Sequence, residues 1–189
     1  GWGGGGAGRR AGGGRGGGGS RNPPQALGAL EVKRGPAALD LARRANGPND
    51  PRHHIAHIQP PDPADLPRLR PLGVVANLQP LWACYDETMA RITVPRVGEE
   101  RFHRMYPIAD IRASGAVMAF GSDWPVSTPN VFQELEVAVT RVSPWARETP
   151  AWNPAQRNDP PTAPAAFPPG AAYVTQHDAG GAPDAGAAA

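Results

Sequence analysis

The segment Ala116–Asn130, with the sequence AVMAFGSDWPVSTPN, constrains the fold of this chain more than any other stretch. Its first five residues form an apolar run that is typical of a strand buried on both faces. Gly121 ends the run, Asp123 follows at once, and a helical pattern begins near Val131. α/β barrels and open α/β sheets position functional groups in this way, with a carboxylate where a buried strand ends. The segment by itself is equally compatible with Asp123 as a turn residue or a helix cap.

Two further segments predict strands that would pair with Ala116–Phe120. His54–Ile58 alternates side chains between two faces and places His57 at its C-terminal end, which makes His57 a candidate metal ligand. Val74–Leu78 is followed by Gln79, which we expect at the same edge of the sheet, as a substrate contact or as a cap of the loop. Helices are predicted over segments that lie before, between and after these strands: Pro36–Asn46, Glu99–Met105, Pro107–Ser114 and Asn130–Arg141.

Glycine and proline, with 24 residues each, concentrate at the two ends of the chain. Glycine loses the most entropy on ordering and proline interrupts helices, so we expect both ends to be disordered. The expected organisation is a Gly/Arg-rich disordered segment over 1–35, one folded region over 36–146, and a degenerate Pro/Ala/Gly-rich tail over 147–189. In particular, Gly1–Arg21 and most of Asn158–Ala189 are predicted to lack regular secondary structure and long-range contacts.

Composition excludes several classes of protein. A formal net charge of +2 identifies no partner, and the single cysteine, Cys84, rules out an internal disulfide framework. Cys84 is not expected to be a nucleophile, because no activating constellation accompanies it. No apolar run is long enough for a membrane span, and no signal-peptide pattern is present, so we expect a cytoplasmic protein. Arginines within the glycine-rich segment Gly1–Ser20 leave open a non-specific RNA-binding tail, although a low-complexity tail explains them as well.

Several motifs, taken in order, resemble the metal-dependent amidohydrolase superfamily. They are RHHIAHIQ, GVVANLQPLWACYDETM, FGSDWPV, WNPAQR and GAAYVTQHDAG. The subgroup that they resemble contains N-substituted formamide deformylase-like and exoenzyme-regulator-like proteins. The resemblance implies an α/β fold, namely a partial (β/α)8 TIM-barrel fragment of about three parallel βα units that represent strands 6 to 8. By that resemblance His57 matches the strand-6 metal ligand and Asp123 the strand-8 ligand. Their separation of 66 positions (123 minus 57) agrees with the roughly 62 residues of two units in a ~250-residue barrel.

The resemblance also implies a chemistry. A divalent metal, by family precedent zinc, activates a water that attacks a small-molecule amide or formamide, and Asp123 moves the proton from that water to the leaving nitrogen. The His-x-His pair and the strand-4 and strand-5 ligands of the family have no match in this chain, so turnover by the chain alone is in doubt. We therefore expect a hydrolase of C–N bonds other than peptide bonds. The alternatives are a non-catalytic amidohydrolase remnant and an Arg/Gly-tailed nucleic-acid-binding protein.

Overall fold

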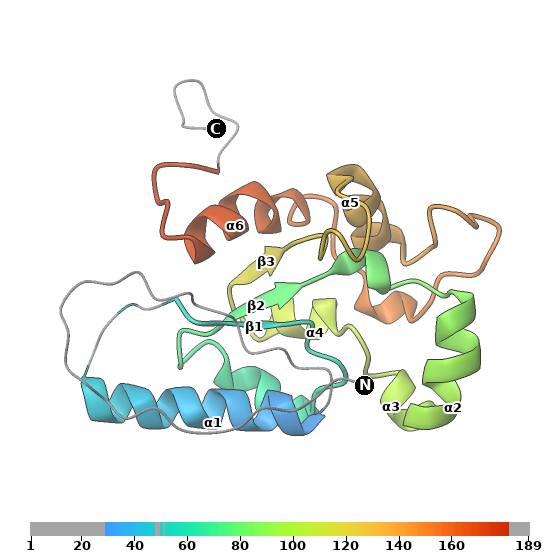
Figure 1. Cartoon of the computed structure of the whole chain (residues 1–189). Coiled ribbons are helices and arrows are strands. Elements are labelled where there is room, and N and C mark those ends of the chain that lie inside the picture. The colour runs from blue at the N-terminus through green and yellow to red at the C-terminus, as the bar shows by residue number, and fades with distance from the viewer. Residues whose placement is uncertain (1–28, 48–49, 51, 182–189) are drawn as a thin grey trace.

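The computed structural model describes residues 29–47, 50 and 52–181. Figure 1 shows three strands with α1 on one side and α5 and α6 on the other. The elements follow in the order α1 (Ala29–Asn46), β1 (His54–Ala56), η1 (Pro63–Arg68), β2 (Val75–Leu78), η2 (Pro80–Trp82), the π-helical turn η3 (Met89–Thr93), α2 (Val94–Val97), α3 (Glu99–Phe102), α4 (Ile108–Ala113), β3 (Met118–Phe120), α5 (Val131–Thr140), η4 (Pro154–Gln156), η5 (Pro164–Ala166) and α6 (Pro168–Val174).

The three strands form one parallel sheet in the order β1-β2-β3, as the sequence predicted. Ile55 lies beside Ala76, and Ala76 beside Met118. Parallel strands need crossover connections of a dozen or more residues, and the segments that contain η1 and α4 supply them. Three strands leave the sheet open, because a closed barrel of this kind needs eight. The carboxyl ends of all three strands therefore lie at one edge.

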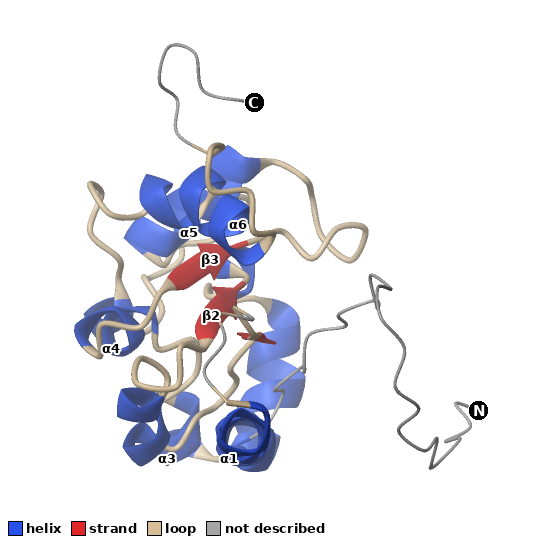
Figure 2. Ribbon diagram, turned by 90° about the vertical axis from the view of Figure 1, so that its left-hand side faces the viewer, coloured by secondary structure: helices blue, strands red, loops and turns tan. Residues whose placement is uncertain are grey.

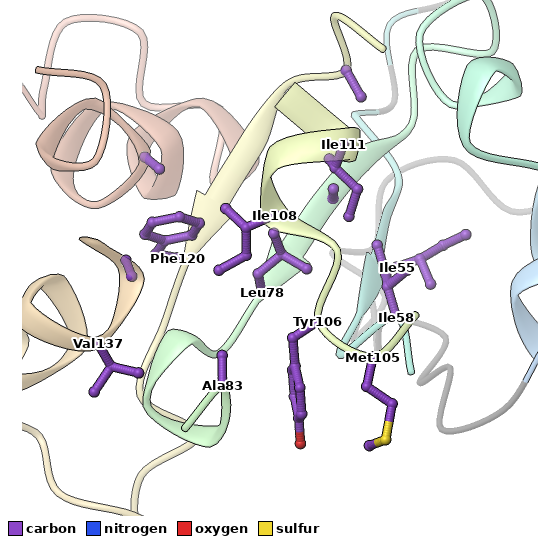
Figure 3. Close-up of a cluster of buried hydrophobic side chains, with 14 of the residues drawn as sticks. Ile55, Ile58, Leu78, Ala83, Met105, Tyr106, Ile108, Ile111, Phe120 and Val137 are labelled. Carbon is purple, nitrogen blue, oxygen red and sulfur yellow. The ribbon is translucent and has the colours of Figure 1, made fainter. Parts of the chain in front are cut away.

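One face of the sheet packs on α4. Figure 3 shows Ile108 and Ile111 of α4 beside Leu78 of β2, with Phe120 of β3 nearby. Ile108, Ile111, Leu78 and Phe120 are all at most 4% exposed. Burial of one such side chain contributes about 1.5–3 kcal/mol, so this layer is a main source of stability. The apolar runs in the predicted strands are explained by this packing.

The helix before β1 is longer than predicted. The sequence places its start at Pro36, but α1 begins at Ala29 and continues through that proline. The reason is tertiary: Val32 is fully buried, and Gly35 lies so close to Ile55 of β1 that a Cβ there would be 3.0 Å from Ile55 Cδ1. Packing on the sheet holds the helix together across a residue that cannot donate a backbone hydrogen bond. β1 is also shorter than predicted, because the backbones of His57 and Ile58 are left-handed (φ 70° and 55°).

The prediction that most of the segment Asn158–Ala189 lacks long-range contacts is wrong for residues 158–181, which the structure describes. η5 and α6 lie within these residues, and Figure 1 shows α6 alongside β3. The prolines do not break these helices, because Pro164, Pro168 and Pro169 occupy their first turns, where no backbone donor is needed. Residues 182–189 lie outside the described part of the chain.

Contacts with the sheet hold this segment in place. The ring of Phe167 packs edge-on against Phe120 at 5.5 Å between centroids. Arg52, just before β1, donates to the carbonyl of Tyr173 at 3.1 Å and places its guanidinium 4.2 Å from the centre of the Tyr173 ring. Arg52 also pairs with Asp178. These long-range contacts offset the ordering entropy that the composition alone suggested could not be overcome.

Two polar side chains cap the first turns of helices. The carboxylate of Asp62 accepts a hydrogen bond from Ala64 N at the start of η1, and Asn130 accepts one from Phe132 N at the start of α5. The segment Trp82–Pro95 contains the turn η3 and the start of α2. None of the described helices combines the length and apolar character that a membrane span requires.

Candidate active site at the carboxyl edge of the sheet

His57 and Asp123 lie at the same edge of the sheet, on either side of β2. His57 is the first residue after β1, and Asp123 is the third after β3. Both are half-buried, and both have left-handed backbones, with φ 70° and 58°. Residues other than glycine rarely adopt this conformation, and those that do are enriched at functional sites. The amide of His57 donates to the carbonyl of Asn77 at 2.9 Å, which ties the turn after β1 to β2.

Gln79, the candidate substrate contact, lies between these two residues. Only 5% of it is exposed, and its Nε2 donates to Asn77 Oδ1 at 2.9 Å. Its Oε1 has no hydrogen-bond partner among the residues that the structure describes. A buried amide oxygen without a partner is unusual, since most such atoms are satisfied. Gln79 is therefore held by its neighbour in β2 and keeps one free acceptor, and its contact with substrate remains a prediction.

Glu134 of α5 is a buried carboxylate that the sequence analysis did not select. It is fully buried, and its Oε2 accepts a hydrogen bond from Leu81 N at 2.8 Å, while Oε1 has no partner within the described part of the chain. Burial raises the pKa of Glu134 to about 7; the bond from Leu81 opposes the rise and the charge of Asp123 adds to it. Glu134 thus joins α5 to the loop after β2 and lies within electrostatic range of Asp123. The sequence did contain a signal, because Glu134 precedes the buried Val137 and Ala138 by three and four residues, on one helical face.

Arg141 anchors the far end of α5. Its side chain is fully buried, with Nε donating to the carbonyl of Trp152 at 3.1 Å and Nη1 to that of Tyr106 at 3.0 Å. Its guanidinium also lies 4.8 Å from the centre of the Trp152 ring. Burial lowers the pKa of Arg141. The cluster fastens the segment after α5 to the core, and we assign it a structural role.

Cys84, which the sequence analysis did not expect to be a nucleophile, is buried, and its thiol donates to the carbonyl of Leu81 at 3.3 Å. Burial raises the pKa of Cys84 to about 11, and Asp86 adds to the rise. A thiol with a raised pKa is a poor nucleophile near neutral pH. The structure therefore offers no activation of Cys84.

The donor set does not complete a metal site. Within residues 29–47, 50 and 52–181, no three His, Cys, Asp or Glu side chains are grouped so as to hold a metal ion. A catalytic zinc ion normally takes three protein ligands and one open position. His57 and Asp123 have the right chemistry, an imidazole nitrogen and a carboxylate oxygen, but they are two donors. No catalytic step can therefore be derived through a metal held by these residues alone.

Comparison with known proteins identifies the family. The sequence profile of the amidohydrolase family matches residues 25–189. This match covers most of the chain, and the chain belongs to the amidohydrolase family. Its α/β fold of three parallel strands with flanking helices is a fragment of the (β/α)8 barrel, as the resemblance implied.

One curated relative is the protein LONG AFTER FAR-RED 3 of Arabidopsis thaliana. It is 32% identical over 137 residues, which make up 70% of this chain and 22% of that protein. Two solved structures are similar in fold, both uncharacterized metal-dependent hydrolases. The one from Pyrococcus furiosus has a TM-score of 0.62 and 21% identity over 86% of this chain, and the one from Pyrococcus horikoshii OT3 has 0.64 and 24% over 83%. The chain covers 30% of each solved structure and about a fifth of the plant protein.

Proposed function

We propose that His57 and Asp123 belong to the active site of a hydrolase that acts on C–N bonds other than peptide bonds, with amides or formamides as substrates. The observation that carries this proposal is their shared position: each follows the carboxyl end of a parallel strand, with one strand between them. Enzymes with barrels of this kind have their catalytic groups at that edge. Membership of the amidohydrolase family supports the reaction class.

The site requires ligands beyond the two donors described here. His57 would contribute a neutral imidazole nitrogen, and Asp123 a carboxylate oxygen, to a divalent metal, with zinc as the first choice. The metal would supply an activated water when it is bound. The remaining ligands belong to other strands of a complete barrel, so the active unit in this proposal is the whole protein.

Asp123 has the role that can be derived from the chain itself. Its carboxylate accepts a proton from the attacking water as the new C–O bond forms. It then donates that proton to the amide nitrogen as the C–N bond breaks, which yields an amine and a carboxylic acid. Asp123 has a left-handed backbone, and the buried carboxylate of Glu134 lies within electrostatic range of it. Substrates are small molecules in this proposal, with formamides first because of the resemblance to the formamide deformylase subgroup.

The test is Asp123→Asn in the full-length protein, measured on a panel of small formamides and amides. Proton transfer by a positioned side chain contributes about 10²–10⁴-fold, so turnover should fall at least a hundredfold while metal content falls less. Asp62→Asn is the matched control, because Asn also serves as an N-cap, and it should leave turnover unchanged. His57→Ala should lower metal content in elemental analysis. Normal hydrolysis by Asp123→Asn would refute the assigned role.

A non-catalytic role is the alternative. It is favoured by the lack of a third metal-binding side chain near His57 and Asp123 among the described residues. Full-length protein that binds no divalent metal and hydrolyses none of the panel would support it. The nucleic-acid alternative depends on Gly1–Ser20, which lies outside the described residues.

A further inference from the structure

A pocket of about 320 Å³ opens beside the candidate active site. One wall, Leu81 and Trp82, belongs to η2 directly after β2, and the opposite wall, 126–128, follows Asp123 by three to five residues. Cys84, Asp86, Ser143 and Trp145 complete the lining. Its volume is at the lower end of the range for small-molecule sites. Both walls follow in sequence from strand ends at the edge that holds His57 and Asp123, although neither of these residues lines the pocket.

Two tryptophans, Trp82 and Trp145, line the pocket. Trp82 is half-buried, and Trp145 is 66% exposed. An exposed indole ring next to a pocket offers apolar surface that a ligand can cover, with a gain from the area removed from water. Val126, on the opposite wall, is 67% exposed as well. The open end of the pocket therefore presents apolar and aromatic surface that a ligand group would cover.

The charge of the pocket is negative. Asp86 is the charged residue of the lining, and no lysine or arginine lines the pocket in the described part of the chain. The Oδ1 atom of Asp86 accepts from Met89 N at 2.6 Å, which holds the carboxylate in place. Cys84 is buried as a neutral thiol, and the nearby guanidinium of Arg141 is directed to the carbonyls of Tyr106 and Trp152. A carboxylate beside tryptophan faces favours an organic cation and disfavours an anion.

We propose that this pocket binds an alkylammonium group of the substrate, with Trp82 and Trp145 contacting its methyl or methylene groups and Asp86 balancing its charge. The inference rests on the proposed function in one respect, because it assigns the bound group to an amide substrate of the same site. Ser127, Thr128 and Ser143 provide hydroxyl groups around the cation. Quaternary ammonium groups are bound in aromatic sites of this chemistry in other proteins.

Binding is tested on the chain without metal, by ligand-observed NMR titration with choline and with its uncharged carbon isostere, neohexanol. Choline should bind at least about threefold more tightly than neohexanol. Asp86→Asn keeps an acceptor for Met89 N, and Trp145→Leu keeps an apolar side chain, so both variants should fold. Each should weaken choline binding by about three- to tenfold and change neohexanol binding by less than twofold.

Asp62→Asn and Phe132→Leu are the controls, since Asp62 and the 81%-exposed Phe132 lie outside the pocket lining. Neither should change choline binding. Equal affinity for the two probes, or unchanged choline binding in Asp86→Asn, would overturn the proposal.

The full-length enzyme separates this inference from the proposed function. For amides that carry a trimethylammonium group, Asp86→Asn should raise KM about three- to tenfold and leave kcat unchanged, whereas matched tert-butyl amides should show no change. If no amide is hydrolysed but choline still binds more tightly to wild type than to Asp86→Asn, the hydrolase proposal fails and the cation site stands. If amides are hydrolysed with equal KM for both series, the cation site fails and the hydrolase proposal stands.

Discussion

Residues 121–130 and 159–170 are both rich in proline, yet they are buried to very different extents. In the first segment, which joins β3 to α5, Trp124 and Val126 are each 67% exposed. In the second, which leads into α6, Ala163, Ala166 and Phe167 are 1%, 3% and 7% exposed. Figure 2 shows the two helices that these segments lead into, α5 and α6, side by side over β3.

This difference in burial assigns the two segments different roles: 159–170 contributes to stability and 121–130 to function. Apolar side chains of 159–170 fill space against the sheet, so their loss should cost folding free energy. Those of 121–130 contribute little to the core, which leaves this loop available for substrate and for Asp123. The following predictions test that division, beginning with the largest expected effect.

Phe167→Ala should destabilise the chain by about 3–5 kcal/mol, because it removes a buried ring that packs against Phe120 and leaves a cavity. Urea denaturation followed by circular dichroism measures the effect. The control is Phe132→Ala, which removes a ring that is 81% exposed and should change stability by less than about 0.5 kcal/mol. Similar small effects in both variants would mean that 159–170 does not belong to the core.

The second prediction concerns the buried carboxyl group of Glu134, which lies within electrostatic range of Asp123 in the 121–130 loop. Its pKa is raised from 4.5 to about 7, mainly by burial, so the folded chain holds a proton that the unfolded chain releases. The resulting stability is complete below pH 4.5 and is lost as pH rises to about 7, by up to about 3 kcal/mol. Glu134→Gln should flatten the urea-derived stability profile in this window, and Glu136→Gln on the same helix should not. An unchanged slope in Glu134→Gln would contradict the burial of this carboxyl group.

Gly170→Ala should destabilise by about 1–3 kcal/mol. A Cβ at this position would lie 2.5 Å from the carbonyl oxygen of Met118 and 3.0 Å from Ala119 Cα, both backbone atoms of β3. This clash should outweigh the gain of about 1 kcal/mol that alanine brings to a helix. Gly121→Ala is the control in the exposed segment, since the nearest atom there is Asn77 Oδ1 at 3.9 Å. A Gly170→Ala variant as stable as wild type in thermal unfolding would show that α6 does not lie against β3.

Trp124→Ala should have the smallest effect on stability, within about 0.5 kcal/mol, because the ring is 67% exposed. Trp152→Ala, in contrast, removes a ring that is 5% exposed and packs on Phe102 and Tyr106. The pair gives a direct comparison of a loop tryptophan with a core tryptophan by chemical denaturation. A large loss of stability in Trp124→Ala would remove the distinction between the two segments.

Sequence reasoning succeeded where structure is determined by neighbours in the chain. The apolar runs around Ile55, Ala76 and Ala119 predicted the three strands, and the family resemblance implied their order. The same reasoning placed His57 and Asp123 at strand ends, because alternation and turn signals identify where a strand stops. Their roles in a site remain proposals, since ligands from other strands are needed to test them.

By itself, the sequence determined where the three strands lie and which polar residues follow them, because periodicity and turn residues act over a few positions, and its resemblance to a known family implied the α/β class and the parallel arrangement. Only the tertiary structure decided that α1 continues through Pro36, that Glu134 is buried beside the loop of Asp123, and that α6 forms at all. These features depend on contacts between distant segments, such as Gly35 with Ile55 and Phe167 with Phe120. Proline content indicated disorder for residues 159–170, but burial against β3 offsets the entropy lost when this segment is ordered. No local sequence pattern predicts whether burial outweighs that loss of entropy.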